Sequence, residues 1–222
     1  MLEDYYGLDK WFKPEVNLKL NIKPIPGLNY QQVVGYENRQ WELHQYWPST
    51  PRSEIDNSRT GHAHLAFSKT ENVTSEGYLS YVKDFKGGHN LNATAGYSYF
   101  EVNGENFGMD NYNFSVDGIK YWDIGQGSDL TDGKAGMSSG KSVTERLFSF
   151  FARANYSYQD KYMLSASIRH EGSSKFAADN RWANFWSATA GWRISNEEFM
   201  KDFDWLDDLK IRFGYGVTGN ND

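Results

Sequence analysis

The chain has 222 residues and no cysteine, and its 29 acidic residues outnumber 23 basic ones to give a net charge of −6. The acidic balance argues against nucleic-acid binding, and the lack of cysteine excludes a disulfide framework and the usual zinc thiolates. Aromatic residues make up 17% of the chain, yet the mean hydropathy is −0.73 and no apolar run is long enough for a membrane-spanning helix. A transmembrane β-barrel is compatible with these values, because only every second residue of its strands must be apolar.

About eight strands are expected along the chain, from their alternating patterns and from the turn residues between them. Tight turns rich in Pro, Gly or Asp alternate with long polar connections, a pattern typical of an up-and-down antiparallel barrel. The expected strands lie near 15–23, 28–38, 62–85, 89–100, 145–156, 161–170, 183–194 and 208–217. The expected tight turns are 24–27, 86–88 and 157–160, and the long connections are 39–61, 101–144 and 171–182.

Large aromatic side chains in the first two long connections are candidate contacts for a ligand or a partner protein. Such side chains stack on sugar faces and anchor protein partners. Alternatively, the connections pack these residues into a small core of their own, and the sequence leaves both possibilities open. The candidates are Trp41, Tyr46, Trp47, Tyr112, Tyr121 and Trp122, accompanied by Phe107 and Phe114.

Two short patterns in the same region suggest chemistry only weakly. His62 and His64 share a strand face and could hold a metal, but a third ligand is not evident, so a polar lumen or loop position is preferred. Residues 136–140 match the nucleophile elbow G-x-S-x-G, but their surroundings predict a flexible loop instead of a strand-to-helix turn. We therefore expect no metal, no cofactor and no catalytic residue.

The C-terminal third carries the clearest alternation. Residues 162–169 place apolar side chains on one face and Met163, Ser165, Ser167 and Arg169 on the other, and two later segments repeat this. A period of two with different faces predicts strands between lipid and a wet lumen. Tyrosines at 156, 158 and 162 gather around one turn, as an interfacial girdle would. The expected lipid-facing residues are Tyr162, Leu164, Ala166, Ile168, Trp186, Trp192, Ile211 and Phe213.

Residues 195–207 interrupt the strand rhythm. Ser195 and Glu198 suggest a capping box that opens a short helix, with Phe199, Met200, Phe203, Trp205 and Leu206 as its apolar stripe. The acidic residues between 197 and 208 lack the spacing of a calcium loop, so a solvated turn is expected. Residues 214–219 match G-x-G-x-x-G, but no helix can follow within the chain, so we interpret them as a glycine-rich lumen face and strand end.

An ordered set of short motifs covers the same third of the chain and extends weakly over residues 14–100. The set comprises RANY at 153–156, YMLSASIR at 162–169, GSSKF at 172–176, NRW at 180–182, AGWRI at 190–194, WL at 205–206, LK at 209–210 and GYGVTGNN at 214–221. Taken together, these motifs resemble the SusC/RagA family of TonB-linked outer-membrane receptors of Bacteroidetes.

The resemblance implies an all-β, antiparallel part of a transmembrane barrel, with residues 1–222 forming one partial barrel domain that lacks the plug and further strands. It implies a multi-pass protein of the cell outer membrane, in contact with outer-membrane lipid and without catalysis. It further implies import of an oligosaccharide or peptide, with a SusD-like surface lipoprotein and a TonB complex as partners. Residues 1–5 do not resemble a signal peptide, so we expect an internal fragment.

The alternative is a soluble all-β carbohydrate-binding or glycan-active domain, in which two sheets pack around a closed hydrophobic core. The two interpretations predict different places for the apolar side chains. In a barrel they form one continuous outward band, whereas in a sandwich they face inward.

Overall fold

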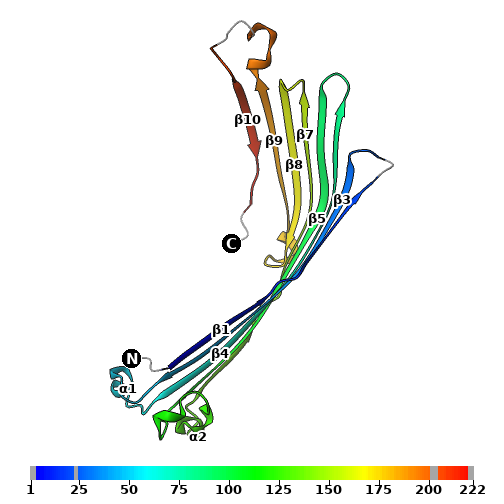
Figure 1. Cartoon of the computed structure of the whole chain (residues 1–222). Helices are drawn as coiled ribbons and strands as arrows, with labels where there is room; N and C mark the ends of the chain where they lie inside the picture. The colour runs from blue at the N-terminus through cyan, green and yellow to red at the C-terminus, as the bar shows by residue number, and fades with distance from the viewer. Residues whose placement is uncertain (1–3, 23–24, 201–204, 220–222) are drawn as a thin grey trace. The chain divides into compact units, whose positions relative to one another are not determined.

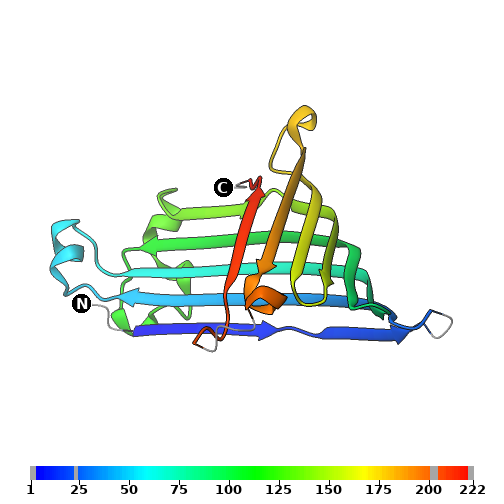
Figure 2. The same ribbon diagram turned by 90° about the horizontal axis from the view of Figure 1, so that it is seen from above.

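The computed structural model describes residues 4–22, 25–200 and 205–219. In this part of the chain, ten strands form one sheet in the order β1-β3-β4-β5-β7-β8-β9-β10, with β2 also paired to β3 and β6 to β5 (Figure 1, Figure 2). The expected antiparallel all-β fold is confirmed, with ten strands where about eight were predicted. The strands are β1 (Asp4–Phe12), β2 (Glu15–Asn21), β3 (Leu28–Trp47), β4 (His62–Phe85), β5 (His89–Tyr112), β6 (Gly136–Lys141), β7 (Glu145–Tyr158), β8 (Tyr162–Ser173), β9 (Trp182–Arg193) and β10 (Lys210–Gly216).

Among the residues that the structure describes, helical structure is confined to short segments in the connections. No helix in the described ranges has the length and apolar character needed to cross a membrane. The helices are α1 (Arg52–Asp56), α2 (Ser128–Thr131) and the 3-10 turns η1 (Asp117–Ile119), η2 (Ile124–Gln126), η3 (Ala178–Asn180), η4 (Ile194–Asn196) and η5 (Glu198–Met200).

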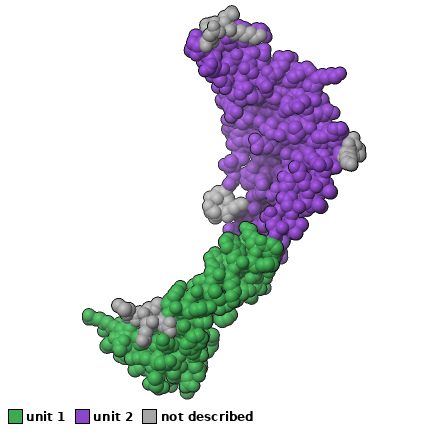
Figure 3. All heavy atoms as spheres, in the orientation of Figure 1, with its two compact units in different colours: residues 1–14, 36–72, 102–144 green, residues 15–35, 73–101, 145–222 purple. Residues whose placement is uncertain are grey.

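The chain divides into two compact units, coloured separately in Figure 3. Each unit is assembled from separate stretches of sequence, because the long strands β3, β4 and β5 contribute residues to both. Unit 1 comprises residues 1–14, 36–72 and 102–144, and unit 2 comprises residues 15–35, 73–101 and 145–222.

Unit 1 contains a small hydrophobic core. Tyr46 on β3 and Ala63 on β4 are fully buried, and Phe114 and Tyr121 from the connection after β5 complete the cluster. Strand β1 pairs with residues 38–46 of β3 and flanks this region.

The prediction of long loops at 39–61 and 101–144 was wrong over much of their length. Strand β3 continues to Trp47 and β5 to Tyr112, and residues 136–141 form β6, paired with β5. Strands with polar side chains on both faces lack a hydrophobic period, so they cannot be distinguished from loops by pattern.

The short helix predicted at 195–207 is present in its described part only as 3-10 turns, and the predicted capping box was wrong. Residues 194–200 form the 3-10 turns η4 and η5, and Ser195 lies inside η4, not at an N-cap. Its hydroxyl donates a hydrogen bond to Asp208 at 3.1 Å, so it takes no part in a capping box. Phe203 of the expected apolar stripe lies outside the described residues.

Unit 2 is built around tight hairpin turns that lie at the same end of its strands (Figure 1). Gly87 and Gly88 have φ of +85° and +83°, and Gln159 and Asp160 both have φ of +52°. Such positive φ values give tight hairpin turns a twist that suits the flanking strands. The Gln159 amide donates to the Gly88 carbonyl at 2.6 Å, which joins the two turns.

Apolar side chains of unit 2 are not gathered into a core. All buried hydrophobic residues in the described part of the chain belong to unit 1. The strands form one sheet, not the two packed sheets that the soluble alternative requires.

Candidate functional site

An aromatic stack in unit 1 joins two of the candidate residues, Trp47 and Tyr112. The His62 ring lies between them, with its centroid 4.6 Å from that of Trp47 and 4.3 Å from that of Tyr112. The Arg59 guanidinium lies 4.0 Å from the Tyr112 centroid and adds a cation–π contact. Three strand ends supply the rings, since Trp47 ends β3, His62 begins β4 and Tyr112 ends β5. We name these four residues the aromatic stack; each is partly exposed.

Asp110 on β5 binds both histidines of the H-x-H pair. Its Oδ1 lies 2.9 Å from His62 Nε2 and 2.8 Å from His64 Nδ1. Burial lowers the pKa of His62, and the hydrogen bond to Asp110 opposes that shift. Burial also disfavours ionised Asp110, but its bonds to His62 and His64 outweigh this and leave its pKa below the ordinary value. Within the described residues, no group of His, Asp or Glu has metal-binding geometry.

A buried carboxylate lies near the aromatic stack. Glu54 on α1 is only 4% exposed, and its Oε2 has no hydrogen-bond partner in the described part of the chain. Its charge acts on both His62 and Tyr112. A buried acceptor without a donor is unfavourable, so a ligand that supplies a hydroxyl or amide donor here would relieve that cost.

Two of the candidate aromatic residues are core residues. Tyr46 and Tyr121 belong to the buried cluster of unit 1, as expected if the connections pack on themselves. The Tyr46 hydroxyl donates to Asp117 at 2.8 Å, and Ser49 donates to the same carboxylate through its amide and hydroxyl. Burial opposes ionisation of Asp117, yet these bonds together keep its pKa below the ordinary value.

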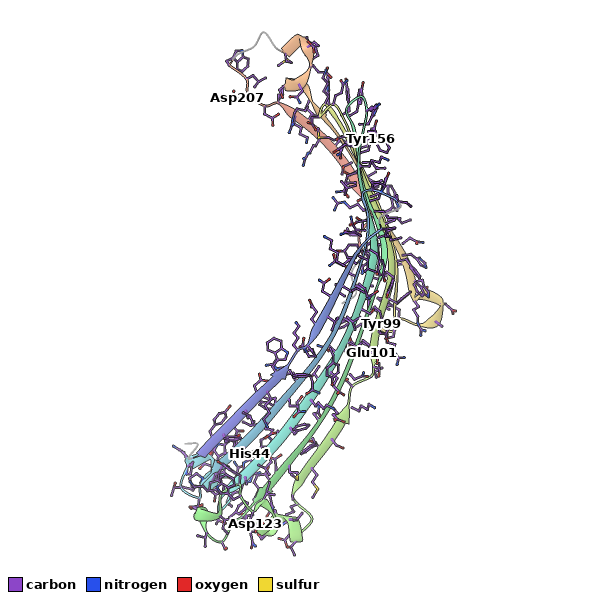
Figure 4. All side chains as sticks on the ribbon, turned by 45° about the vertical axis from the view of Figure 1, so that its right-hand side comes forward. His44, Tyr99, Glu101, Asp123, Tyr156 and Asp207 are labelled. Carbon is purple, nitrogen blue, oxygen red and sulfur yellow. The ribbon has the colours of Figure 1, made fainter. Side chains whose placement is uncertain are left out.

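The remaining candidates, Trp41 and Trp122, differ in exposure. Trp122 is 77% exposed and follows Tyr121, whose ring contacts it at 4.9 Å between centroids. On its other side Tyr121 contacts His44 at 5.3 Å, in the part of unit 1 labelled in Figure 4. Trp41 lies within β3, opposite Asp9, and not in a loop as predicted. Of this pair, Trp122 is therefore the side chain most available to a ligand.

Strands β7–β10 of unit 2 separate apolar and polar side chains onto opposite faces. Residues directly opposed in an antiparallel pair share a face, and the register pairs Ala166 with Ala188 and Ser167 with Ser187. Leu164 is 54% exposed and Phe213 77%, because no second layer covers the apolar face. The register puts all eight expected lipid-facing residues on this one face. That the face contacts lipid stays a prediction.

Aromatic side chains bracket the apolar face at two levels, ten residues apart along a strand. At one level the Phe148 ring lies 6.4 Å from the rings of Tyr99, labelled in Figure 4, and Trp182. At the other level the rings of His89 and Tyr158 lie 4.5 Å apart. An even spacing keeps both members of each pair on one face. The bracketing pairs are Trp182 and Trp192 on β9, Phe148 and Tyr158 on β7, and His89 and Tyr99 on β5.

Glu197, between η4 and η5, anchors the turn end of β8 and β9. It accepts hydrogen bonds from the Tyr162 hydroxyl at 2.7 Å, the Trp192 indole at 3.0 Å and the Lys161 ammonium at 3.0 Å. These donors lower the pKa of Glu197 to about 2. Two of the expected lipid-facing residues thus direct their polar atoms toward this turn, as aromatic residues do at a membrane interface.

The structure does not place the short sequence motifs in the conformations that their chemistry requires. Residues 136–140 lie in the extended strand β6, which corrects the predicted flexible loop and also excludes the sharp elbow that a nucleophile requires. Residues 214–216 end β10, and the Asn that follows Gly219 lies outside the described residues. Two members of the acidic group, Asp202 and Asp204, also lie outside them.

Sequence reasoning missed three residues around the aromatic stack. The H-x-H spacing identified His62 and His64, but nothing local indicates Asp110, which is 48 residues from His62 and meets it only through strand pairing. Arg59 and Glu54 carry no pattern that separates them from solvated loop residues.

Comparison with known proteins finds the same fold and related sequences. Residues 4–221 match the family described as "TonB dependent receptor-like, beta-barrel". "TonB-dependent receptor P39" of Formosa agariphila is 31% identical over 209 residues, which are 90% of this chain and 19% of that protein. "TonB-dependent receptor SusC" of Bacteroides thetaiotaomicron is 42% identical over 88 residues, covering 40% of this chain and 9% of that protein.

Among solved structures, the RagAB peptide importer in its "closed-closed" state superposes with a TM-score of 0.81 and 24% identity, over 98% of this chain and 23% of that one. At this level of identity the likeness establishes the fold alone. The chain spans about a fifth of the length of P39.

Proposed function

This chain belongs to the TonB-dependent receptor β-barrel family, which confirms the resemblance drawn from its motifs, and on that premise we propose that it forms part of the wall of an outer-membrane nutrient importer. One observation carries the proposal. The apolar residues of strands β7–β10 form a continuous, uncovered face backed by a polar one. A sheet in water would bury such a face, whereas a barrel wall exposes it to lipid.

The aromatic levels of unit 2 define the segment that we propose to cross the membrane. Ten strand residues, as between Trp182 and Trp192, cover about 33 Å at about 3.3 Å each. A strand tilt of about 40° reduces this to about 25 Å, the height of the apolar band in outer-membrane barrels. Trp and Tyr at both limits suit the interfaces between hydrocarbon and headgroups.

The proposed orientation follows from the two kinds of strand connection. Tight turns such as 86–88, together with the connection that contains Glu197, belong to the periplasmic side, where barrel turns are short. Unit 1 contains the long connections that follow β3 and β5, so we assign it to the external side, where barrel loops are long. The strands of unit 1 carry polar side chains on both faces, which suits contact with water on both sides.

We propose the aromatic stack as a contact for the transported oligosaccharide or peptide, or for a surface lipoprotein of the SusD type. The support is chemical: the Trp47 and Tyr112 rings offer stacking faces, and Glu54 offers an unsatisfied acceptor nearby. Energy from a TonB complex completes the proposed transport role. No catalytic step is assigned to this chain.

Site-directed labelling tests the membrane assignment, because this chain contains no cysteine of its own and the unsubstituted receptor reports any labelling elsewhere. Ala166→Cys on the apolar face and Ser167→Cys on the polar face are adjacent and close in size. In outer membranes that contain the full receptor, we expect Ser167→Cys to react with a membrane-impermeant maleimide. Ala166→Cys should react only with a lipid-soluble one.

Ser138→Cys, on exposed strand β6 of unit 1, serves as the control that must react with both reagents. Equal reaction of Ala166→Cys and Ser167→Cys with the impermeant reagent would show that the apolar face is wet. That result would refute the membrane-wall proposal.

A further inference from the structure

The polar face of β7–β10 is hollowed into a cup of about 620 Å³, which we name the basic hollow. It lies entirely within unit 2, and strands β7, β8, β9 and β10 supply nearly all of its lining. Small side chains form its floor, which is why the face is concave there. The floor residues are Ser165, Ser167, Ser187, Thr189 and Gly191.

Three cationic side chains surround this floor, and no carboxylate lines the hollow in the described part of the chain. Arg153 on β7 lies on one side, and Lys210 and Arg212 on β10 lie on the other. None of the three forms an ion pair with a described residue, and Asp208, just before β10, is engaged by Arg193 at 3.3 Å. Uncompensated positive charge in a concave polar surface attracts anions.

The side-chain stems of two of the cations lie beside Gly191. Arg212 is directly opposite Gly191 in the β9–β10 pair. A methyl group on Gly191 would lie 3.5 Å from both Arg212 Cγ and Lys210 Cε, so both stems approach the glycine closely. The hydroxyl oxygens of Ser167 and Ser187 lie 2.7 Å apart on the floor. One hydroxyl donates to the other, and the accepting hydroxyl can donate its own proton to an anion.

We propose that the basic hollow binds an extended acidic peptide with carboxylates at alternate positions. Lys210 and Arg212 are alternate residues on one strand face, which places them about 7 Å apart. Alternate side chains of an extended peptide have the same spacing, so two carboxylates can meet the two cations together. Arg153 is three strands away, about 14 Å across the sheet, and the register also offsets it from Arg212 by four residues, about 13 Å, along the strands. This separation suits a further acidic group of an elongated ligand and not a compact anion.

The inference rests on the proposed function, because the polar face must border the lumen for a transported peptide to reach it. It goes further by assigning a charge preference to the substrate. The three cationic residues belong to strands β7 and β10, so the preference for acidic peptides should persist when substitutions in unit 1 alter external recognition.

The experiment compares two hexapeptides on the full receptor, purified in detergent. One alternates glutamate with glycine, and the other has glutamine in place of each glutamate. We expect the receptor to bind the acidic peptide about tenfold more tightly at low salt, from two partly exposed charge pairs. The double variant Lys210→Gln, Arg212→Gln should bind both peptides equally.

Lys86→Gln is the matched control, since it removes one positive charge from an exposed turn outside the hollow. It should leave the tenfold preference unchanged. Equal binding of the two peptides by the wild type would overturn the proposal, as would loss of the preference in Lys86→Gln.

If another segment of the receptor fills the hollow, the wild type should show no peptide preference and the double variant should lower its melting temperature. That result would also overturn the proposal. The cysteine labelling of Ala166 and Ser167 reports separately on the membrane assignment, so failure of the peptide test leaves that assignment standing.

Discussion

An arginine at mid-depth on the apolar face should destabilise the receptor far more than one on the adjacent polar position. Ala166 pairs with Ala188, which is six residues from Trp182 and four from Trp192. With about 3.3 Å per residue and a tilt of about 40°, Ala166 lies about 10 Å from one aromatic level and about 15 Å from the other. Ala166→Arg therefore places a guanidinium near the middle of the hydrocarbon.

The expected cost of Ala166→Arg is about 2–4 kcal/mol, which lowers the folding equilibrium constant by a factor of about 30 to 1,000. Alanine is small, so lost packing contributes little to this free-energy cost. Ser167→Arg is the matched control at the same depth on the wet face, and it loses one hydrogen bond to Ser187, worth about 1 kcal/mol.

The assay is urea unfolding of the full receptor from phosphocholine vesicles, followed by tryptophan emission. Ala166→Arg should shift the midpoint to lower urea by clearly more than Ser167→Arg does. Equal shifts, or a larger shift for Ser167→Arg, would refute the assignment of the two faces. Folding of the wild type without detergent or lipid would refute it as well.

Four further predictions concern the turn end and unit 1. The low pKa of Glu197 keeps it ionised, so its contribution to stability should persist above pH 4.5 and disappear toward pH 2. Hydrogen exchange at the adjoining hairpin should show this loss of stability. The variant Glu197→Gln should abolish the pH dependence. Burial lowers the pKa of His62, so the unfolded chain gains its proton first and unit 1 should lose stability below about pH 6.5, detectable in the emission of Trp47. Tyr46→Ala should destabilise unit 1 by about 3–5 kcal/mol in limited proteolysis, and a change under 1 kcal/mol would contradict its core position. Trp47→Ala should weaken substrate binding at least severalfold, whereas Trp205→Ala, also a loss of one tryptophan, should leave binding unchanged.

The sequence by itself determined the strands of unit 2 closely. The strand expected at 161–170 is β8 (Tyr162–Ser173), and the one expected at 183–194 is β9 (Trp182–Arg193). Alternation is a local property, because successive side chains of any strand point to opposite faces. When the two faces have different environments, the sequence therefore alternates with a period of two.

The strand extensions of unit 1 were not predictable in the same way. Trp47 and Tyr112 were identified as aromatic candidates but assigned to loops, whereas they end strands β3 and β5. Where water meets both faces of a strand, either face accepts polar residues and the alternation disappears. Backbone hydrogen bonds then hold the strand in the sheet without any requirement on side-chain pattern.

Only the tertiary structure decided which residues meet. His62 and Asp110 approach each other across paired strands, and Arg212 faces Gly191 only because β10 adopts one particular register on β9. Backbone hydrogen bonds between strands are the same for every side chain, so no local pattern records which residues they bring together. The faces of this sheet were therefore readable from its sequence, but the aromatic stack and the basic hollow depend on register, which the whole fold sets.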